Sequence, residues 1–323
     1  AEADRIQKIL SSDKRLWSVV RSELIEIRSL YADARRTAIA GHVEEFNYDA
    51  DAYITKESAF VVISKEGWFK RQSSFSEISK VRTRDDDEVR WVYKTHTRAT
   101  ITFFTSHGGA YTLLVDTIPP TTGYGEPVQA HFQFEDGERV VGVISNDAAF
   151  AMETQQHLGI SDTPPPPWAI GVTKGGKTMR FSLTTFQDVS TKRGRRFARL
   201  ASGDRVFIVY PTDGTETLNL ATVKGRALVF DSAEVNMLRA AGRGVTAIKL
   251  QEGDSVMAAE LCTSTMDGPT VVTAQGREFV VRERKFKRAS RGGRGRVVLK
   301  RGSIETWISK PMVALGPAKA GEE

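Results

Sequence analysis

The sequence predicts a mainly β protein built as a disc of five repeated sheets, with six as the alternative count, preceded by a short α-helical segment. Three observations lead to this fold class. Helical periodicity is confined to the N-terminal part of the 323 residues. After about residue 42 the chain consists of short runs rich in Val, Ile, Phe and Thr, separated by Gly. Two glycine signatures then recur with one shared period.

Residues 12–31 are predicted to form a helix. Ser12 is a suitable N-cap, and apolar residues follow at three- and four-residue spacings in one stripe: Leu16, Val20, Leu24, Ile27 and Tyr31. Such a stripe requires a covering surface. We therefore interpret this helix as the last part of a longer helical element.

The first signature is a β-prone run, then Ser or Thr, two residues, Gly and another β-prone run, which is typical of a hairpin. It occurs five times: Ser64–Gly67, Thr105–Gly108, Thr173–Gly176, Thr222–Gly225 and Thr273–Gly276. The second signature is a turn that enters a strand: Gly137–Val140, Gly203–Val206 and Gly253–Val256. A loop with Gly-x-Gly or Gly beside basic residues precedes each of these turns. Together they indicate about five units of roughly 50 residues, near the blade length of kelch propellers.

These patterns divide the chain into three parts. Residues 1–41 are the helical part, residues 42–310 form the disc, and residues 311–323 have little to bury and are expected to be disordered. Residues 147–167, which end in four prolines, are expected to connect two blades stiffly.

Composition excludes several classes of protein. With 40% hydrophobic and 27% charged residues the chain is globular, and no apolar run is long enough to span a membrane. The single cysteine, Cys262, excludes an internal disulfide and a cysteine-zinc cluster. Residues 1–160 carry 19 Lys and Arg against 24 Asp and Glu, whereas residues 161–323 carry 27 against 16. This polarity indicates a polyanionic partner for the second half.

Signals for enzyme chemistry are weak. Gly171–Thr178 has the spelling of a P-loop, but an alternating strand pattern follows it where a P-loop needs a helix, so we interpret it as a hairpin turn. The five histidines lie in different repeats, without the spacing of metal ligands, and Asp85–Glu88 lacks the glycine of a calcium loop. Cys262 is predicted to be a buried strand residue. No catalytic, cofactor-binding or metal-binding residue is therefore assigned.

Basic segments carry the candidate site. Two clusters fall in corresponding parts of the repeat, around the hairpin and the Gly-basic loop, and a disc places corresponding loops on one rim. A continuous basic rim suits the phosphate backbone of duplex DNA. The candidate DNA-binding residues are Lys285, Lys287, Arg288, Arg291, Arg294, Arg296, Lys300 and Arg301, continued by Lys174, Lys177, Arg180, Arg193, Arg195, Arg196, Arg199 and Arg243.

Several motifs in the same order resemble a known family, the C-terminal part of the A subunit of bacterial type IIA topoisomerases, gyrase and topoisomerase IV. They are Tyr31–Thr37 after the helix, Lys65–Arg71, Gly123–Pro127, Gly242–Gly244 and Leu250–Asp254. The resemblance runs from about residue 10 to residue 308. It implies a β-pinwheel whose rim binds and bends or wraps duplex DNA without base specificity, after a helix that ends a coiled-coil arm.

The resemblance also implies partners and a location. These are an ATPase B subunit and the rest of a dimeric A subunit, in the cytoplasm at the nucleoid and not at a membrane. ATP and Mg are expected elsewhere in the holoenzyme, with no cofactor in this chain. No tyrosine here matches the family's DNA-cleaving motif, so this chain is expected not to be catalytic alone. Gyrase carries a Gln-Arg-Arg-Gly-Gly-Lys-Gly box in its first blade, whereas residues 80–88 here contain no such box and a similar Ser290–Gly295 stands in the last repeat. This difference favours topoisomerase IV over gyrase. Two alternatives belong to other functional classes: an RNA-binding segment and a protein-interaction propeller.

Overall fold

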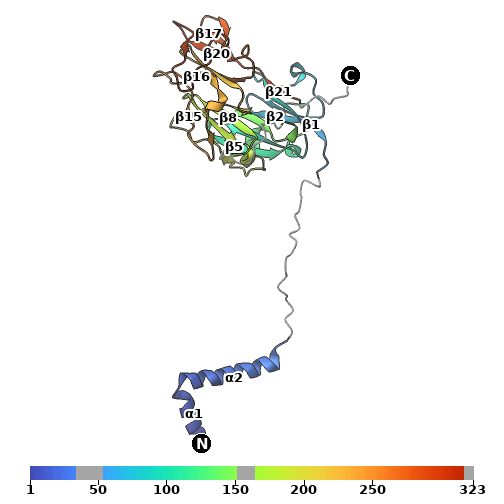
Figure 1. Ribbon diagram of the computed structural model, residues 1–323. Helices are drawn as coiled ribbons and strands as arrows, with labels where there is room; N and C mark the ends of the chain where they lie inside the picture. The colour runs from blue at the N-terminus through green and yellow to red at the C-terminus, as the bar shows by residue number, and fades with distance from the viewer. Residues whose placement is uncertain (34–53, 151–163, 316–323) are drawn as a thin grey trace. The chain divides into compact units, whose positions relative to one another are not determined.

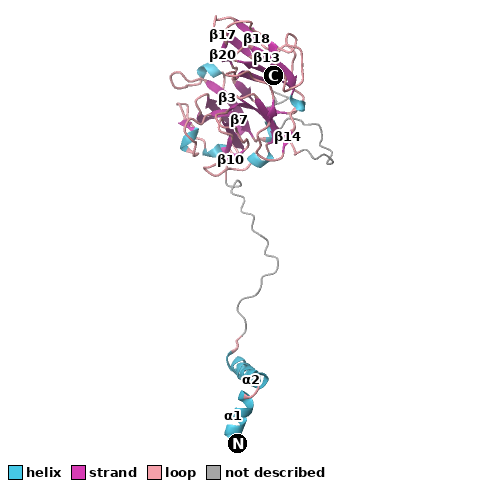
Figure 2. Cartoon of the chain, turned by 90° about the vertical axis from the view of Figure 1, so that its left-hand side faces the viewer, coloured by secondary structure: helices cyan, strands magenta, loops and turns pink. Residues whose placement is uncertain are grey.

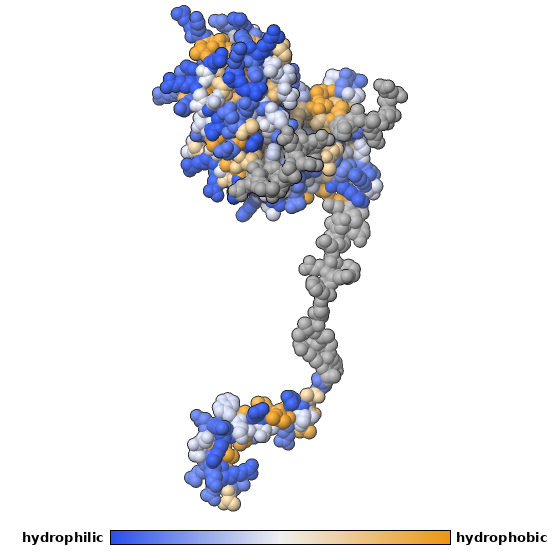
Figure 3. All heavy atoms as spheres, in the orientation of Figure 1, coloured by the Kyte–Doolittle hydropathy of each residue, from blue (hydrophilic) through white to orange (hydrophobic). Residues whose placement is uncertain are grey.

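The computed structural model describes residues 1–33, 54–150 and 164–315, and the chain divides into two compact units, Ala1–Asp49 and Ala50–Glu323. The first unit contains α1 (Glu2–Leu10) and α2 (Asp13–Tyr31), with Ser12 as the N-cap residue of α2 (Figure 1). The predicted helix over residues 12–31 is therefore confirmed. Neither helix buries a residue, and the apolar stripe of α2 is exposed except at Val20, as the orange side chains in Figure 3 show. The predicted boundary at residues 41 and 42 lies outside the described residues. No described helix is long and apolar enough to cross a membrane.

The second unit contains five sheets built mainly from antiparallel strands, which we call blades 1 to 5 in chain order. Figure 2 shows these sheets in magenta within one body. Blade 1 consists of β1 (Ser58–Ser64), β2 (Trp68–Gln72), β3 (Val89–His96), β6 (Glu126–Pro127) and β21 (Met312–Ala314). Blade 2 consists of β4 (Thr100–Thr105), β5 (Gly109–Leu114), β7 (Val140–Ser145) and β10 (Arg195–Arg196). The five predicted blades are confirmed for the described residues.

Blades 3 and 4 follow the same plan, and blade 5 has three strands. Blade 3 consists of β8 (Trp168–Thr173), β9 (Lys177–Ser182), β11 (Val206–Thr212), β14 (Met237–Leu238) and β15 (Val245–Thr246). Blade 4 consists of β12 (Thr217–Thr222), β13 (Arg226–Asp231), β16 (Val256–Cys262) and β19 (Arg296–Val297), and blade 5 of β17 (Thr270–Thr273), β18 (Glu278–Val280) and β20 (Ile304–Ile308).

Both glycine signatures have the roles predicted for them. The first signature is the hairpin turn of every blade, and its last glycine has a positive φ, from 74° at Gly225 to 84° at Gly67. The second signature leads into β7, β11 and β16. Gly171–Thr178 is the hairpin of β8 and β9, so the P-loop spelling lies on two antiparallel strands, and β9 stands where a P-loop has its helix.

Each of blades 1 to 4 is completed by a strand from the next repeat. The chain forms the hairpin β4–β5 of blade 2, crosses to blade 1 as β6, and returns to blade 2 as β7. In the same way β10 pairs with β5, β15 with β9, and β19 with β13. Within a sheet these exchanged strands lie on the edge opposite β3, β7, β11 and β16. Since β3, β7, β11, β16 and β20 contact one another in this order, the exchanged strands lie at the outer rim.

The core lies between neighbouring blades. Phe69 of blade 1 meets Phe103 of blade 2 with ring centroids 5.7 Å apart, and Phe104 of blade 2 meets Phe181 of blade 3 at the same separation. All four side chains are buried. Burying one such ring contributes about 1.5–3 kcal/mol, so the stability of a blade depends on its neighbours.

The predicted disordered tail is wrong for its first residues. Met312–Ala314 form β21, which pairs in parallel with β3 of blade 1. Met312 and Ala314 are half-buried against the core between blades 1 and 2. The alternating apolar residues Met312 and Ala314 thus pack on a surface of the core. The sequence alone does not show that this surface is next to them. Residues 316–323 lie outside the described residues, as do residues 151–163 of the predicted connection.

Candidate nucleic-acid interface

The exchanged strands share one local structure, which fixes where their side chains lie. Each begins with a glycine at positive φ, between 64° and 83°: Gly125, Gly194, Gly244 and Gly295. A Cβ at these glycines would collide with a backbone carbonyl oxygen of the strand beside it, which explains why the repeat requires Gly. Three residues after each glycine, an N–H donates to the carbonyl of a hairpin-turn glycine: Val128 to Gly67, Phe197 to Gly108, Ala247 to Gly176 and Val298 to Gly225.

Further backbone bonds join successive exchanged segments along the rim. The N–H of Arg199 donates to the carbonyl of Gly242 at 2.9 Å, and the N–H of Lys249 donates to the carbonyl of Gly293 at 2.8 Å. Likewise, the N–H of Gln133 donates to the carbonyl of Lys192. The segments therefore form one continuous edge across blades 2, 3 and 4. We call its cations the basic rim, and they are Lys192, Arg193, Arg195, Arg196, Arg199, Arg243, Lys249, Arg294 and Arg296.

Most predicted site residues are accessible on this edge or beside it. Arg193, Arg196, Arg199, Arg243, Arg294 and Arg296 are exposed members of the basic rim. Lys174 and Lys177, from the hairpin of blade 3, are also exposed. Lys300 and Arg301, which follow β19, are exposed, as are Lys285 and Lys287 between β18 and β19. Arg195 is half-buried and donates from Nη1 to the carbonyl of Asp188 at 2.7 Å.

Three predicted contacts have structural surroundings that do not suit phosphate binding. Arg288 is paired with Asp231 at 2.5 Å and with Glu283 at 3.0 Å, so its charge is already compensated. The half-buried Arg291 donates from Nε to the carbonyl of Glu234 at 2.8 Å, while its own N–H donates to the Glu234 carboxylate. Arg180 lies over the Trp168 ring, 5.6 Å from its centroid, and burial lowers the pKa of its guanidinium. Local charge density does not distinguish these arginines from exposed ones.

Two cations of the basic rim, Lys192 and Lys249, are absent from the candidate residues of the sequence analysis, and Lys249 is the one that no cluster of charge marks. It stands alone between Ile248 and Leu250. Its place on the rim follows only from its equivalence to Arg199. Each of the two residues lies two positions after a residue whose N–H donates to the carbonyl of a turn glycine. Lys177, Lys249 and Arg294 line one hollow of about 680 Å³ between blades 3 and 4, where Lys177 Nζ donates to Thr246 Oγ1 at 2.9 Å. Three cations with one acid, Glu252, at this hollow favour an anionic group.

The rim changes character in blade 1. Its exchanged strand carries Glu126, whose Oε1 lies 2.5 Å from His131 Nε2, in place of the arginines of blades 2 and 4. Tyr124 is half-exposed beside it, with the Arg82 guanidinium 5.9 Å from its ring centroid. The positive edge is thus concentrated on blades 2 to 4, in agreement with the charge asymmetry of the sequence.

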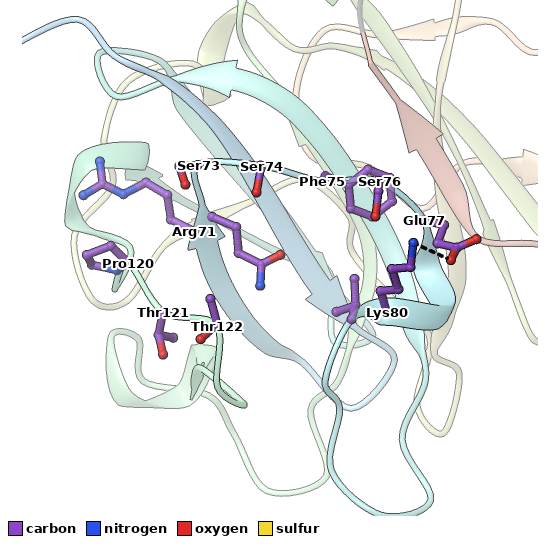
Figure 4. A pocket seen from close by; sticks show the side chains of 12 residues that line it. Arg71, Ser73, Ser74, Phe75, Ser76, Glu77, Lys80, Pro120, Thr121 and Thr122 are labelled. Carbon is purple, nitrogen blue, oxygen red and sulfur yellow. Dashed lines mark ion pairs between the residues drawn. The ribbon is translucent and has the colours of Figure 1, made fainter.

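Another hollow is less suited to binding an anion. Figure 4 shows this hollow, of about 740 Å³, in blade 1, with Arg71 and Lys80 among its lining residues. Both cations are paired, Arg71 with Asp116 and Lys80 with Glu77, at 3.1 Å each. Among the described residues no group of three His, Cys, Asp or Glu side chains could hold a metal ion. Cys262 is buried, as predicted, and burial raises the pKa of its thiol to about 12.

Comparison with known proteins relates three of the blades to one family model. Residues 99–147, 169–213 and 218–263 match the family model described as DNA gyrase C-terminal domain, beta-propeller, and these ranges are the consecutive repeats that build blades 2, 3 and 4. Three of the five blades thus match the gyrase C-terminal domain family. The chain is 29% identical over 309 residues to the DNA gyrase A subunit of Haloquadratum walsbyi, covering 92% of this chain and 35% of the relative. It is 26% identical over 302 residues to the DNA topoisomerase 4 A subunit of Bacillus subtilis, covering 92% and 36%.

Solved structures agree on the architecture. A crystal structure of the C-terminal domain of DNA topoisomerase IV superposes with a TM-score of 0.67 at 24% identity, covering 79% of this chain and 78% of that one. At this identity the likeness establishes the fold. The chain spans about one third of the length of its gyrase and topoisomerase IV relatives, and both kinds of A subunit match it.

Proposed function

We propose that this gyrase-type C-terminal domain binds duplex DNA along its basic rim, without base specificity, and bends it. The continuity of the rim carries this proposal. Backbone bonds join the exchanged segments of blades 2, 3 and 4, so Arg196, Arg243 and Arg294 lie on one edge. Duplex DNA presents one phosphate charge per about 1.7 Å of axis, and a row of cations on a curved edge meets such a polymer best when the polymer is bent.

The energy balance supports bending over simple adhesion. Bending a site of 20–30 base pairs costs about 1–6 kcal/mol, which additional phosphate contacts must offset. Every phosphate contact also releases counterions, so affinity depends strongly on salt. Rim arginines flanked by glycines allow the backbone to approach phosphate groups as well.

Binding to a short duplex tests the proposal directly. The full chain should retain a duplex of about 40 base pairs in a gel shift, with log affinity falling linearly as log salt rises, and with no preference among sequences. Single-stranded RNA of equal length should compete weakly. A preference for single strands would favour the glycine-arginine segment as an RNA binder, and absence of salt-sensitive retention would favour a protein-interaction propeller.

We further propose that the chain is the DNA-binding part of a topoisomerase IV-like A subunit. Blade 1 supports this choice over gyrase, because Ile78–Lys80 form a 3-10 turn and the run that follows contains four successive acids, Asp85–Glu88. Partners would be the rest of the A subunit, through the apolar stripe of α2, and the B subunit, at the nucleoid in the cytoplasm. ATP and Mg would act in those parts of the holoenzyme.

Sealing nicked circular DNA with ligase in the presence of the chain tests the extent of wrapping. A topoisomerase IV-like domain bends weakly, so the linking number of the sealed circles should change little. A shift that grows in proportion to bound protein would indicate gyrase-like wrapping.

A further inference from the structure

The outer edge of blade 5 carries a strand site that no described residue fills. Blades 1 to 4 each receive an exchanged strand, but the sheet of blade 5 is β18-β17-β20 and ends at β18. Gly276 is the turn glycine equivalent to Gly67, Gly108, Gly176 and Gly225, which are all buried. Gly276 is exposed, and a Cβ added there would have no described atom within 4 Å. Figure 2 shows β17, β18 and β20 together at one end of the body.

Backbone groups at this edge lack the bonds that their counterparts make. The carbonyls of the other four turn glycines each accept an N–H from an exchanged segment, whereas no described donor reaches the Gly276 carbonyl. Lys300 is equivalent to Arg199 and Lys249, yet its N–H meets no described carbonyl. The N–H of Val281 donates to the carbonyl of Pro269, and the N–H of Thr273 donates to the carbonyl of Arg277. In this register the backbone groups of Phe279, between them, face β17. The N–H and C=O groups of Glu278 and Val280 therefore point outward.

Each other site is filled by a strand from the repeat of the following blade, and the described residues of blade 1 do not supply such a strand to blade 5. In the other blades 26 to 29 residues separate the hairpin glycine from the turn before the inner strand, and the exchanged segment lies within them. In blade 1 only 19 residues separate Gly67 from Asp86, the corresponding turn residue. Those residues pack on their own blade, where Phe75, Ile78 and Val81 lie against Val62 and Val92.

The filled sites specify what fits. In blades 2 to 4 the occupant is six residues long, for example 242–247 in blade 3: the carbonyl of its first residue accepts from the preceding segment, and the N–H of its sixth donates to the turn glycine. The third residue is Gly and the sixth is apolar. The fourth residue of the occupant pairs with the second residue after the turn glycine. The fifth residue pairs with the first residue after the turn glycine. In blade 5 these positions are Glu278 and Arg277, both exposed.

We propose that β18 binds an extended segment of another protein by strand addition. The segment has Gly third, a basic residue fourth, an acidic residue fifth and an apolar residue sixth. The fourth residue pairs with Glu278 and the fifth with Arg277, since opposite charges across a sheet stabilise the pairing. The carbonyl of the first residue accepts from Lys300 and the N–H of the sixth donates to Gly276. This interaction does not depend on DNA binding by the rim.

A capped peptide containing Gly-Arg-Gly-Arg-Glu-Val, with one further residue after the valine, tests the site with the full chain. It should bind, and it should slow hydrogen exchange at Glu278, Val280 and Lys300. A peptide with the fourth and fifth residues swapped, Gly-Arg-Gly-Glu-Arg-Val, has the same composition and should bind more weakly. A peptide N-methylated at its valine should bind about tenfold more weakly, because it lacks the N–H for Gly276.

Variants of the chain complete the test. Gly276→Ala should block a peptide that continues one residue past its valine, since a Cβ at Gly108 or Gly176 in a filled site would lie 2.6 or 2.7 Å from the carbonyl oxygen of the residue that follows the sixth. Gly302→Ala is the matched control, because Gly302 also has a positive φ and open space around it, and it should bind the peptide as the wild type does. Equal binding by both variants, or protection of other amides, would overturn the proposal. So would protection of these amides by duplex DNA alone, or self-association of the chain that the peptide reverses, since the occupant would then be nucleic acid or a second copy.

Discussion

An arginine can hold a phosphate group only if no carboxylate already compensates its charge. Arg288 and Arg294 belong to the same basic run of the sequence, but Arg288 is paired with Asp231 and Glu283, and Arg294 is exposed with no carboxylate pair among the described residues. The sequence predicted the positive charge of this region correctly. It could not predict which cations are paired, because Asp231 lies 57 positions from Arg288 and meets it only in the fold.

Arg294→Ala should lower the slope of log affinity for duplex DNA against log salt by about 0.9, the effect of one lost phosphate contact. Arg288→Ala is the matched control. It should leave the slope unchanged and lower the free energy of unfolding by at most about 1 kcal/mol, because exposed ion pairs contribute little. Binding isotherms at several salt concentrations and urea unfolding measure the two quantities. Equal changes of slope in both variants would contradict the distinction.

Cys262 reports on the integrity of blade 4. Its thiol has a pKa of about 12 in the fold, so at pH 8 the reactive thiolate is scarcer than in an unfolded chain by about a thousandfold. The thiol should therefore react slowly with iodoacetamide at pH 8 and quickly in denaturant. The folded state keeps this proton at pH values where the unfolded thiol loses it, so Cys262 makes the free energy of unfolding fall as the pH rises from about 9 toward 12. Rapid labelling of the native chain would show that blade 4 opens.

The exchanged strand is the element on which the rim depends. Hairpins were predictable because turn and strands are adjacent in sequence, and their glycines mark the turn. The exchanged pairings were not predictable, since β10, β15 and β19 are two residues long and their partners lie in the preceding repeat. Their Gly-basic loops were recognised as recurrent, but periodicity does not show which sheet a strand joins.

Gly244→Ala should detach β15 from β9. A Cβ there would collide with the Thr178 carbonyl at a φ of +67°, and the strand must move to relieve the collision. We expect the free energy of unfolding to fall by about 3 kcal/mol or more and the Ala247 amide to lose its protection from exchange. Gly203→Ala is the control: its φ of +77° is similar but its surroundings are open, so only the left-handed backbone cost of about 1 kcal/mol should appear. Similar losses in the two variants would mean that the exchanged strand is not held as described.

The closure of the molecule depends on residues that the sequence placed in a disordered tail. β21 pairs with β3, and Arg90 of β3 donates from Nη1 to the Lys310 carbonyl at 2.8 Å while lying 5.4 Å from the Trp307 ring centroid of blade 5. These contacts join the last blade to the first. A strand of only three residues carries too little periodicity to be recognised in the sequence.

Truncation after Lys310 should therefore loosen blade 1 and leave blade 3 intact. Hydrogen exchange at Val92, which pairs with Val313, should accelerate, while exchange at Val172 should not change. Truncation after Leu315 is the control and should preserve both. Unchanged protection of Val92 in the shorter chain would show that β21 does not hold the first blade.

At the scale of the whole molecule, one duplex is expected to contact blades 2, 3 and 4 at the same time. The most direct measurement is the salt dependence of affinity for a single short duplex, with Arg196→Ala, Arg243→Ala and Arg294→Ala, each alone and all together. A continuous basic rim predicts that each change lowers the slope by about 0.9, that the triple variant lowers it by about 2.7, and that one duplex binds per chain. A triple variant that loses no more slope than a single one, or a chain that binds several duplexes independently, would contradict it.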